Sequence, residues 1–426
     1  MAARAGRTLF AAMLAGAVAL TTACGGSTGS DGSGTTLVVK TFSQFGYDDL
    51  YKEFEASHPG VTIKEENIAK LGDYVPKLQQ WMTAGSGAGD VVAIEEGNLS
   101  QYMATPDKFV NLLDKGAATL APNFLEWKWK QAMTPDGKTL IGLGTDIGAQ
   151  GMCYRKDLFA KAGLPTDREQ VAALWPTWDA YIDTGKRFLA ASPGAKFYDA
   201  SGGLYQNIVM QQGDHTYYDT ANNLVVDTNP AVRFAFDKTV TMIQAGLSAN
   251  IDQWSPPWNA GFKNGAFATI ACPSWMLATI EKQAGPENAG KWDVTKVPGD
   301  GAVRGGSFLG VPTQSKNQDL AAELVQFLTS SKGQIAAFKA KSNFPSSPQA
   351  IDDTVVQSFT NPYFDNAPVG KIFGASAKSV RPVYLGPANV AMNDRFGNAL
   401  LAIEQGKLTP ADAWAKAVDD VKRLAK

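Results

Sequence analysis

The sequence predicts an α/β fold built on a parallel sheet with helices on its faces. Three short runs of apolar and β-branched residues, 36–42, 61–68 and 90–94, have the length and composition of buried strands. Segments with helical spacing separate these runs, and such strand–helix alternation is typical of parallel sheets covered by helices. The chain has 426 residues, a length that ordinarily forms two domains or one large two-lobed body.

The segment after the first strand carries a clear helical pattern. Apolar residues recur at i, i+3, i+4 and i+7, which puts them on one face of a helix: Tyr47, Leu50, Tyr51 and Phe54. A His-Pro-Gly run at 58–60 ends this helix. A second helix is expected over about 73–83, between the second and third strands.

Two loops follow strand ends and are the expected ligand-binding edge. Open parallel sheets bind ligands beyond the carboxyl ends of their strands. The loops 43–47 and 95–100 occupy that position after the first and third strands.

The rest of the chain alternates between the same two kinds of element. Residues 140–154 are extended and glycine-rich, and 156–162 form a short helix that Gly163 caps. Residues 165–260 are mainly helical, and 267–272 return to strand character. A further amphipathic helix covers 319–329. The last helix begins at Thr409-Pro410, with an acid at Asp412, and we expect it to bury Trp414, Val418, Val421 and Ala425.

The first 23 residues have the pattern of an export signal. Arg4 and Arg7 precede an apolar stretch, 9–20, that is too short to span a bilayer as a permanent helix. The following run, Thr-Thr-Ala-Cys-Gly-Gly at 21–26, resembles the bacterial lipobox, which implies a lipid on Cys24. Thr21 stands where that motif usually has leucine, so ordinary secretory cleavage near Ala23 remains the alternative. Residues 24–35 are then expected to be the lipidated cysteine and a flexible tether, because they are almost all Gly, Ser and Thr.

Net charge and cysteine count limit the partners and the cross-links that the protein can have. The chain has 39 basic and 41 acidic residues, and removal of the signal takes two arginines away, for a mature net charge of −4. This balance argues against a nucleic-acid partner, which would need a basic patch. Beyond Cys24 only Cys153 and Cys272 remain. An exported protein can form one bridge, but two inert buried thiols are the favoured interpretation.

Five separated segments, taken in order, resemble one known family. They match the extracellular solute-binding proteins of ABC importers, in the maltose-binding-protein-like carbohydrate group. The matching segments are LVVKTFSQFGYDDLYKEFEASHPGVTI at 37–63, GDVVAIEEG at 89–97, GMCYRKDLFAKAGL at 151–164, FKNGAFATIACPSW at 262–275 and GGSFLGVPTQSKNQDLAAELVQFLTSSKGQ at 305–334. The opening TFSQFGYDDL also looks like members associated with cellobiose uptake.

The resemblance implies a two-lobed periplasmic-binding-protein-like fold with hinge crossings and a ligand cleft between the lobes. We expect crossings near 147–151, 268–270 and 310–312. Lobe one would then be 36–148 with 270–310, and lobe two 150–268 with 312–426. The implied function is capture of a disaccharide or short oligosaccharide by lobe closure, and delivery to the permease subunits of an ABC importer. No cofactor is implied, and a monomer held at the cell membrane by its lipid is expected.

A sugar site needs flat aromatic faces and side chains that bond hydroxyl groups. Trp275 stands where the family places a ring-stacking tryptophan. Trp254 and Trp258 lie in a proline-rich polar loop, and one of them is expected to contact ligand. Trp127 and Trp129 point apart on a helix, so at most one of them faces the cleft. The hydrogen-bonding candidates are Glu95 or Glu96, of which one faces the sugar, together with Gln44, Asp146, Ser274, Ser307 and Tyr205.

Two other functions use similar residues. A secreted carbohydrate-active hydrolase would need two carboxyl groups at a set separation, which sequence cannot measure. The only histidines, His58 and His215, belong to no metal-ligand cluster, and no phosphate loop or nucleophile elbow occurs. The third function is a surface adhesin or sensor-coupled sugar-binding module. We expect a binding protein rather than an enzyme.

Overall fold

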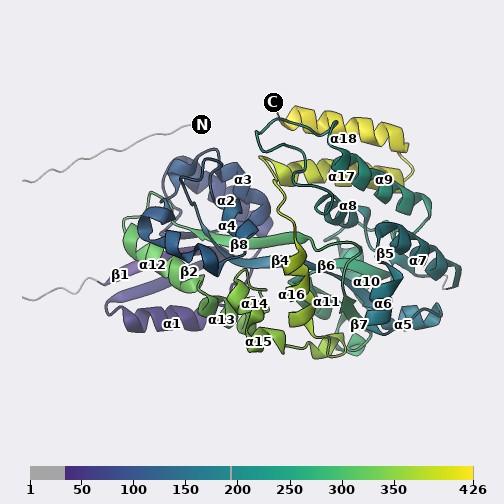
Figure 1. The fold of residues 1–426 in the computed structure, drawn as a ribbon, viewed down its shortest axis with the longest axis horizontal. Coiled ribbons are helices and arrows are strands. Elements are labelled where there is room, and N and C mark those ends of the chain that lie inside the picture. The colour runs from purple at the N-terminus through teal and green to yellow at the C-terminus, as the bar shows by residue number, and fades with distance from the viewer. Residues whose placement is uncertain (1–33, 192–193, 426) are drawn as a thin grey trace, which may run out of the picture.

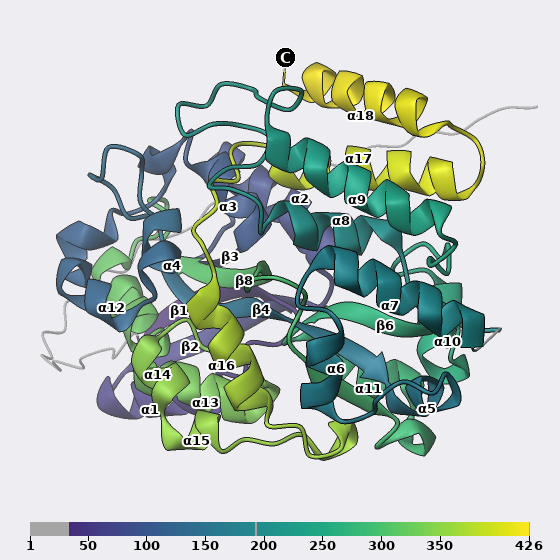
Figure 2. The same ribbon diagram turned by 45° about the vertical axis from the view of Figure 1, so that its right-hand side comes forward.

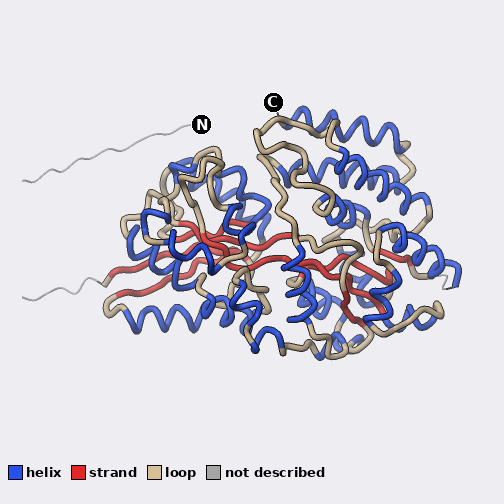
Figure 3. Tube along the Cα trace, viewed as in Figure 1, coloured by secondary structure: helices blue, strands red, loops and turns tan. Residues whose placement is uncertain are grey.

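A band of eight strands runs through the molecule and joins its two halves (Figures 1 and 3). The computed structural model describes residues 34–191 and 194–425, so the expected signal, Cys24 and tether lie outside the described residues. The strand order is β2-β1-β3-β8-β4-β6-β5, with β7 paired to β4. The strands are β1 Thr35–Phe42, β2 Val61–Ile68, β3 Val91–Glu95, β4 Leu143–Arg155, β5 Lys196–Tyr198, β6 Phe267–Pro273, β7 Trp292–Thr295 and β8 Val303–Gly310.

The first three strands confirm the sequence prediction. β1 pairs with β2 and with β3 in parallel. The sheet is nevertheless mixed, because β8 runs antiparallel to both β3 and β4. The expected parallel pairing therefore holds for these strands, and antiparallel strands are added to it. The antiparallel strands come from segments that return to the sheet from distant parts of the chain.

Helices of the first half surround β1, β2 and β3. They are α1 Asp48–Ser57, α2 Leu71–Ala84, α3 Glu96–Tyr102, α4 Glu126–Gln131, α12 Gln318–Leu328 and α13 Ser331–Lys341, with the 3-10 turns η1 Pro106–Lys108, η2 Leu112–Lys115 and η3 Ala117–Asn123. The apolar face predicted for α1 is buried as expected: Tyr47, Leu50, Tyr51 and Phe54. The expected loop 95–100 is instead mostly helix α3. Glu96 stands in the first turn of this helix, where a carboxylate interacts favourably with the helix dipole.

Helices of the second half lie on both faces of the other end of the sheet, with α17 and α18 on one side and α11 and α16 on the other (Figures 1 and 2). They are α5 Lys156–Lys161, α6 Arg168–Leu174, α7 Trp178–Ala191, α8 Ser201–Val209, α9 Pro230–Gln244, α10 Pro256–Asn264, α11 Met276–Ala284, α14 Pro348–Asp352, α15 Thr354–Gln357, α16 Val369–Ser379, α17 Asn389–Glu404 and α18 Pro410–Leu424, with η4 Pro286–Asn288 and η5 Pro362–Phe364. None of the described helices is long and apolar enough to cross a membrane.

The last helix follows its predicted cap but not all of its predicted stripe. Thr409 Oγ1 accepts a hydrogen bond from the backbone N–H of Asp412 at 3.2 Å, which satisfies a helix N-terminal donor. The buried residues of α18 are Ala413, Ala417, Val418 and Val421. Ala425 is exposed and Trp414 only partly buried, because the buried face is centred on the two alanines rather than on the tryptophan.

The long strand β4 connects the two halves. Its first part, up to Ala149, pairs with β8, and its second part, from Gln150, pairs with β6 and β7. The β4–β8 register shifts on either side of Ile147. A Cβ atom placed on Gly148 would lie only 1.9 Å from the carbonyl oxygen of Arg304. Glycine is therefore required at this contact between the two crossing segments.

Two hydrophobic cores define the lobes and correct the expected boundaries. The first core contains buried residues of β1, β3, the start of β4, the end of β8 and α12, with partly buried residues of β2 packed against it, and it extends to Ala337. The second core contains residues 152–303 and 338–421 among its members. Residues 270–303 therefore pack with lobe two, and 308–337 pack with lobe one. The crossing expected at 268–270 lies instead within β8, between Val303 and Phe308, and the one expected at 310–312 lies within α13, between Ala337 and Phe338.

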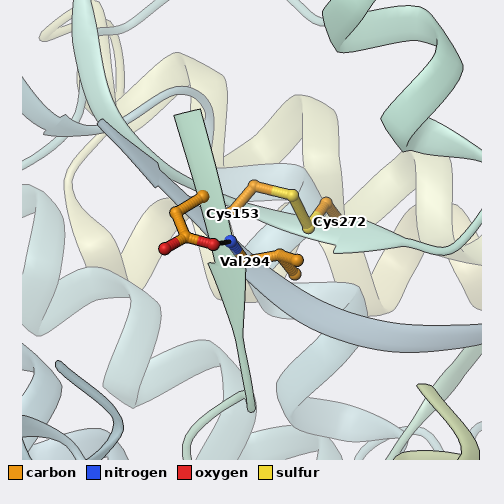
Figure 4. The surroundings of a disulfide bond; sticks show 4 residues. Cys153, Cys272 and Val294 are labelled. Carbon is orange, nitrogen blue, oxygen red and sulfur yellow. Dashed lines mark hydrogen bonds between the residues drawn. A yellow bond between two sulfur atoms is a disulfide. The ribbon is translucent and has the colours of Figure 1, made fainter. Parts of the chain in front are cut away.

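Cys153 and Cys272 form a disulfide bond that ties β4 to β6 just beyond the crossing (Figure 4). Their Cα atoms are 5.7 Å apart, within the range that a disulfide spans. In the antiparallel register Cys153 faces Ile270 and Gly151 faces Cys272, so the two cysteines are diagonal neighbours. The interpretation as two free thiols was wrong, because sequence does not reveal this register.

Candidate ligand site between the lobes

The candidate site lies where β3, β8 and the end of β6 meet at the junction of the lobes. Trp275 lies two residues after the end of β6 and caps the start of helix α11. Its indole Nε1–H donates a hydrogen bond to the carbonyl oxygen of Arg304 at 3.0 Å. The residue is partly exposed, so part of its surface is accessible.

Trp254 extends the aromatic surface of Trp275. The two rings are stacked, with centroids 6.0 Å apart and planes inclined by 21°. Trp254 is 54% exposed, which is unusual for so large an apolar side chain. Its backbone has a φ of 71°, in the left-handed region that non-glycine residues rarely occupy.

Trp258 belongs to the core and not to the site. It is 0% exposed, and its Nε1–H donates to Asp199 Oδ2 at 2.7 Å. We expected one of Trp254 and Trp258 to contact ligand. Trp258 has no exposed surface, so only Trp254 is left as a candidate. Trp258 instead packs its ring against the ring of Trp254, with centroids 4.9 Å apart.

The neighbouring glutamates at the end of β3 have different surroundings. Glu96 is buried and accepts a hydrogen bond from Lys128 Nζ at 3.1 Å. Glu95 is partly exposed, and burial of its carboxyl group raises its pKa. A Cβ atom placed on Gly305 would lie 3.4 Å from Trp275 Nε1 and 3.8 Å from Glu95 Oε1. Glu95, and not Glu96, is therefore the acid beside the aromatic surface.

Lys128 is a buried cation that the sequence did not single out. It is 0% exposed and lies 3.8 Å from the centroid of the Phe308 ring. Its neighbours Trp127 and Trp129 both pack into the protein interior and not toward the site. The signal in the sequence was a lysine between two tryptophans, a pattern that suits a charge held in an apolar environment.

Asp146 occupies the crossing part of β4. Thr145 Oγ1 donates to its Oδ1 at 2.6 Å. Burial raises the pKa of Asp146, while the positive charge of Lys128 acts in the opposite direction. The carboxyl group is therefore close to both the hinge and the buried lysine, as its place near the first crossing predicted.

Arg304 is the main residue of the site that sequence reasoning missed. Its Nη2 donates to Gln253 Oε1 at 3.1 Å, while its Nη1 has no hydrogen-bond partner among the described residues. Burial lowers the pKa of this guanidinium, and the nearby Asp199 and Glu95 carboxylates favour its charged form. The available signal was a basic residue just before the glycine pair of the returning segment.

The remaining predicted residues are scattered around this centre. Ser307 is buried and faces Glu95 in the β3–β8 register. Ser274 is also buried, and its hydroxyl donates to the carbonyl oxygen of Ile147 at 3.2 Å, so it supports the crossing. The side chain of Gln44 is exposed after β1.

Tyr205 lies in the core, contrary to its predicted role. It is 0% exposed and shares a hydrogen bond of 3.0 Å with the hydroxyl group of Tyr217. Its ring stacks on Phe396 with centroids 5.2 Å apart. Because no part of Tyr205 is exposed, the prediction of a direct ligand contact is corrected.

Asn207 adds unpaired polar groups on the side of lobe two. It is 2% exposed, and neither its amide oxygen nor its amide nitrogen has a partner among the described residues. One turn earlier on α8, a Cβ atom placed on Gly203 would lie 2.6 Å from Gln253 Nε2. Asn207 therefore shares the face of α8 that approaches the residue bonded to Arg304. No pattern in the sequence distinguished it.

Together these residues can bind an uncharged molecule with a flat apolar face and hydroxyl groups at its edge. The indoles of Trp254 and Trp275 supply the apolar surface. Glu95 and Asp146 supply acceptors, and Arg304 supplies a donor. Among the described residues, no three His, Cys, Asp or Glu side chains come together as metal ligands.

The sequence and fold of the chain are similar to those of known proteins. Residues 49–362 match the profile of a family described as bacterial extracellular solute-binding proteins. A solved structure described as an extracellular solute-binding protein of family 1 is 41% identical, with a TM-score of 0.87. It covers 92% of this chain and 100% of its own.

Two further relatives are more distant. The arabinooligosaccharide-binding protein of Bacillus subtilis strain 168 is 26% identical over 331 residues, which are 72% of this chain and 71% of that protein. An ABC-transporter-associated binding protein from B. animalis subsp. lactis Bl-04, solved in complex with β-1,6-galactobiose, is 20% identical with a TM-score of 0.73. It covers 92% of this chain and 98% of its own, and at this identity it shows a shared fold alone.

Proposed function

Because the chain belongs to the bacterial extracellular solute-binding protein family, we propose that it captures a short oligosaccharide between its lobes and delivers it to the permease of an ABC importer. The observation that carries this proposal is the stacked pair of Trp254 and Trp275 beside Glu95. Indole faces pack against the C–H faces of sugar rings, and carboxylates accept hydrogen bonds from hydroxyl groups.

Contributions from both lobes support a mechanism by closure. Glu95 follows a strand of lobe one, whereas Trp254 and Trp275 belong to lobe two. A sugar that touches both sets gains its full binding energy only when the lobes are together, so it shifts the population toward the closed form. Helix α3 of lobe one already approaches α17 of lobe two, because a Cβ atom placed on Gly97 would lie 2.8 Å from Val390 Cγ2.

The proposed ligand is a disaccharide or short oligosaccharide such as cellobiose. Two stacked tryptophans offer more aromatic surface than one pyranose ring needs. Two relatives suggest further sugars to test, since one is named as an arabinooligosaccharide-binding protein and another was solved with β-1,6-galactobiose. A thermal-shift screen with cellobiose, arabinotriose and β-1,6-galactobiose tests the proposal, because a ligand that binds the folded state raises the melting temperature. No shift with any of them would count against it.

We further propose that the protein is exported and lipidated on Cys24. Support comes from the basic and apolar leader, from the lipobox-like run at 21–26, and from the Cys153–Cys272 disulfide, which is typical of oxidising compartments. Cys24→Ser should release the protein from the membrane fraction of expressing cells. Equal membrane retention of the wild type and the variant would refute lipidation at this position.

A further inference from the structure

Trp254 holds a backbone conformation that needs external support. Its φ of 71° lies in the left-handed region, which is strained for a residue with a Cβ atom and persists only where the surroundings enforce it. The ring is 54% exposed, so burial of the tryptophan itself does not hold the loop in place. The support must therefore come from neighbouring residues.

Both the oxygen and the nitrogen of the Gln253 side-chain amide form hydrogen bonds. Its Oε1 accepts from Arg304 Nη2 at 3.1 Å, and its Nε2 donates to Asp199 Oδ2 at 2.8 Å. The same Asp199 oxygen accepts from Trp258 Nε1 at 2.7 Å. The residue just before Trp254 is thus fixed between a cation and a buried carboxylate, and Trp258 beneath Trp254 is part of the same network.

Arg304 bonds Trp275 directly and is linked to Trp254 through Gln253. Its backbone carbonyl receives the indole N–H of Trp275, and its guanidinium reaches Trp254 through Gln253. Arg304 itself lies on β8, which pairs with β3 and β4 of lobe one, and its carbonyl oxygen lies against Gly148 of the crossing. One residue on a segment shared by the lobes therefore connects two tryptophans of lobe two.

We propose that Arg304 is a positioning residue, whose guanidinium acts through Gln253 to hold Trp254 stacked on Trp275 and thereby sets the affinity for sugar. This proposal rests on the proposed function for its last step, whereas the effect on the stack is independent of any ligand. A planar guanidinium with several fixed donors can bond the Gln253 amide while facing Asp199 and Glu95. A lysine ammonium is a flexible point charge and cannot reproduce that geometry.

The test compares Arg304→Lys and Gln253→Leu with the wild type. Trp254→Phe serves as the reference for a lost indole pair. Arg381→Lys serves as a matched control, because Arg381 is exposed and pairs with Asp300 away from the tryptophans. Two readouts are used: the exciton band of coupled indoles in far-ultraviolet circular dichroism, without ligand, and calorimetric titration with cellobiose, arabinotriose and β-1,6-galactobiose.

Both site variants should lose more than about half of the exciton band that Trp254→Phe removes. Both should also bind the best of the three sugars about fivefold or more weakly, and Arg381→Lys should match the wild type. An exciton band of wild-type size in either folded variant overturns the proposal, as does a reduced band with unchanged affinity. If Gln253→Leu does not fold, Arg304→Lys alone decides. If the wild type binds none of the sugars, the proposed function fails, and the positioning role is judged on the band.

Discussion

The indole Nε1 of Trp275 lies 3.0 Å from the carbonyl oxygen of Arg304 and donates a hydrogen bond to it. This contact links the second residue after β6, in lobe two, to the strand that returns to lobe one. The tryptophan best placed to contact a ligand is therefore fixed to the segment that joins the lobes. Loss of its ring should affect binding far more than folding.

Trp275→Ala should weaken sugar binding at least about tenfold, which corresponds to about 1.4 kcal/mol. The ring is partly exposed, so its removal leaves less of a cavity than the loss of a core indole. Calorimetric titration with the sugar that the wild type binds gives the affinity. Trp414→Phe, in the α9–α18 region, is the control and should bind normally. Unchanged affinity in folded Trp275→Ala would remove this residue from the site.

Glu95→Gln should affect mainly sugar binding, whereas Glu96→Gln should affect mainly stability. Glu96 is the carboxylate partner of Lys128, and both side chains are buried. Glu96→Gln leaves that ammonium without its partner charge and should cost about 3 kcal/mol in the free energy of unfolding. Glu95→Gln should instead lower sugar affinity with little change in stability. Urea denaturation and calorimetry measure the two effects, and an exchange of the two phenotypes would show that the assignment is reversed.

Trp254→Asn should fold as stably as the wild type and bind sugar about tenfold more weakly. The left-handed backbone at this position is tolerated better by asparagine than by tryptophan, so relief of strain offsets the lost ring contacts. The melting temperature and the dissociation constant check the two parts. A melting temperature well below that of the wild type would indicate that Trp254 is a structural residue.

Replacement of both Cys153 and Cys272 by serine should lower the free energy of unfolding by about 4 kcal/mol. The bridge closes a loop with a sequence separation of 119 residues, and cross-links of long loops restrict the unfolded chain most. Denaturation of the wild type with and without reductant gives the same comparison without mutation. Detection of two free thiols in the unreduced, denatured protein would disprove the bond.

The contribution of Glu95 and Asp146 to stability should fall as the pH rises above their ordinary pKa values. Burial raises the pKa of Glu95 from 4.5 and that of Asp146 from 3.8. The folded state therefore holds these protons more tightly than the unfolded chain, and the resulting stabilisation, present at low pH, is lost as pH rises through the raised pKa values. The double variant Glu95→Gln, Asp146→Asn should show a smaller fall in the free energy of unfolding with rising pH. An identical slope in urea denaturation from pH 4 to 7 would contradict the raised values.

Local patterns predicted the elements that depend on local sequence. β1, α1 and β2 lie where apolar spacing placed them, because burial of one face dictates period and length. The lobe boundaries expected at 268–270 and 310–312 differ from the division into two cores, which depends on the pairing of β8 with β3 and β4. Long-range pairing of this kind leaves no local signal.

The site residues also divide into those that local sequence indicated and those that depend on long-range packing. The sequence pointed to Trp275 through the family resemblance, to Trp254 through its polar loop and to Glu95 through its place at a strand end, and the structure brings these three side chains together. Trp258 and Tyr205 were misjudged because burial depends on the packing of distant helices. Arg304 and Asn207 were missed because an arginine or asparagine is ordinary on a surface, and becomes informative only when its polar atoms are buried without partners.

The most direct test of the central claim is calorimetric titration of the purified protein with cellobiose, arabinotriose and β-1,6-galactobiose, followed by chromatography of the sugar recovered. The account predicts that at least one sugar binds in a one-to-one ratio and is recovered intact. Absence of binding heat for all three, or recovery of cleaved sugar, would contradict capture between the lobes.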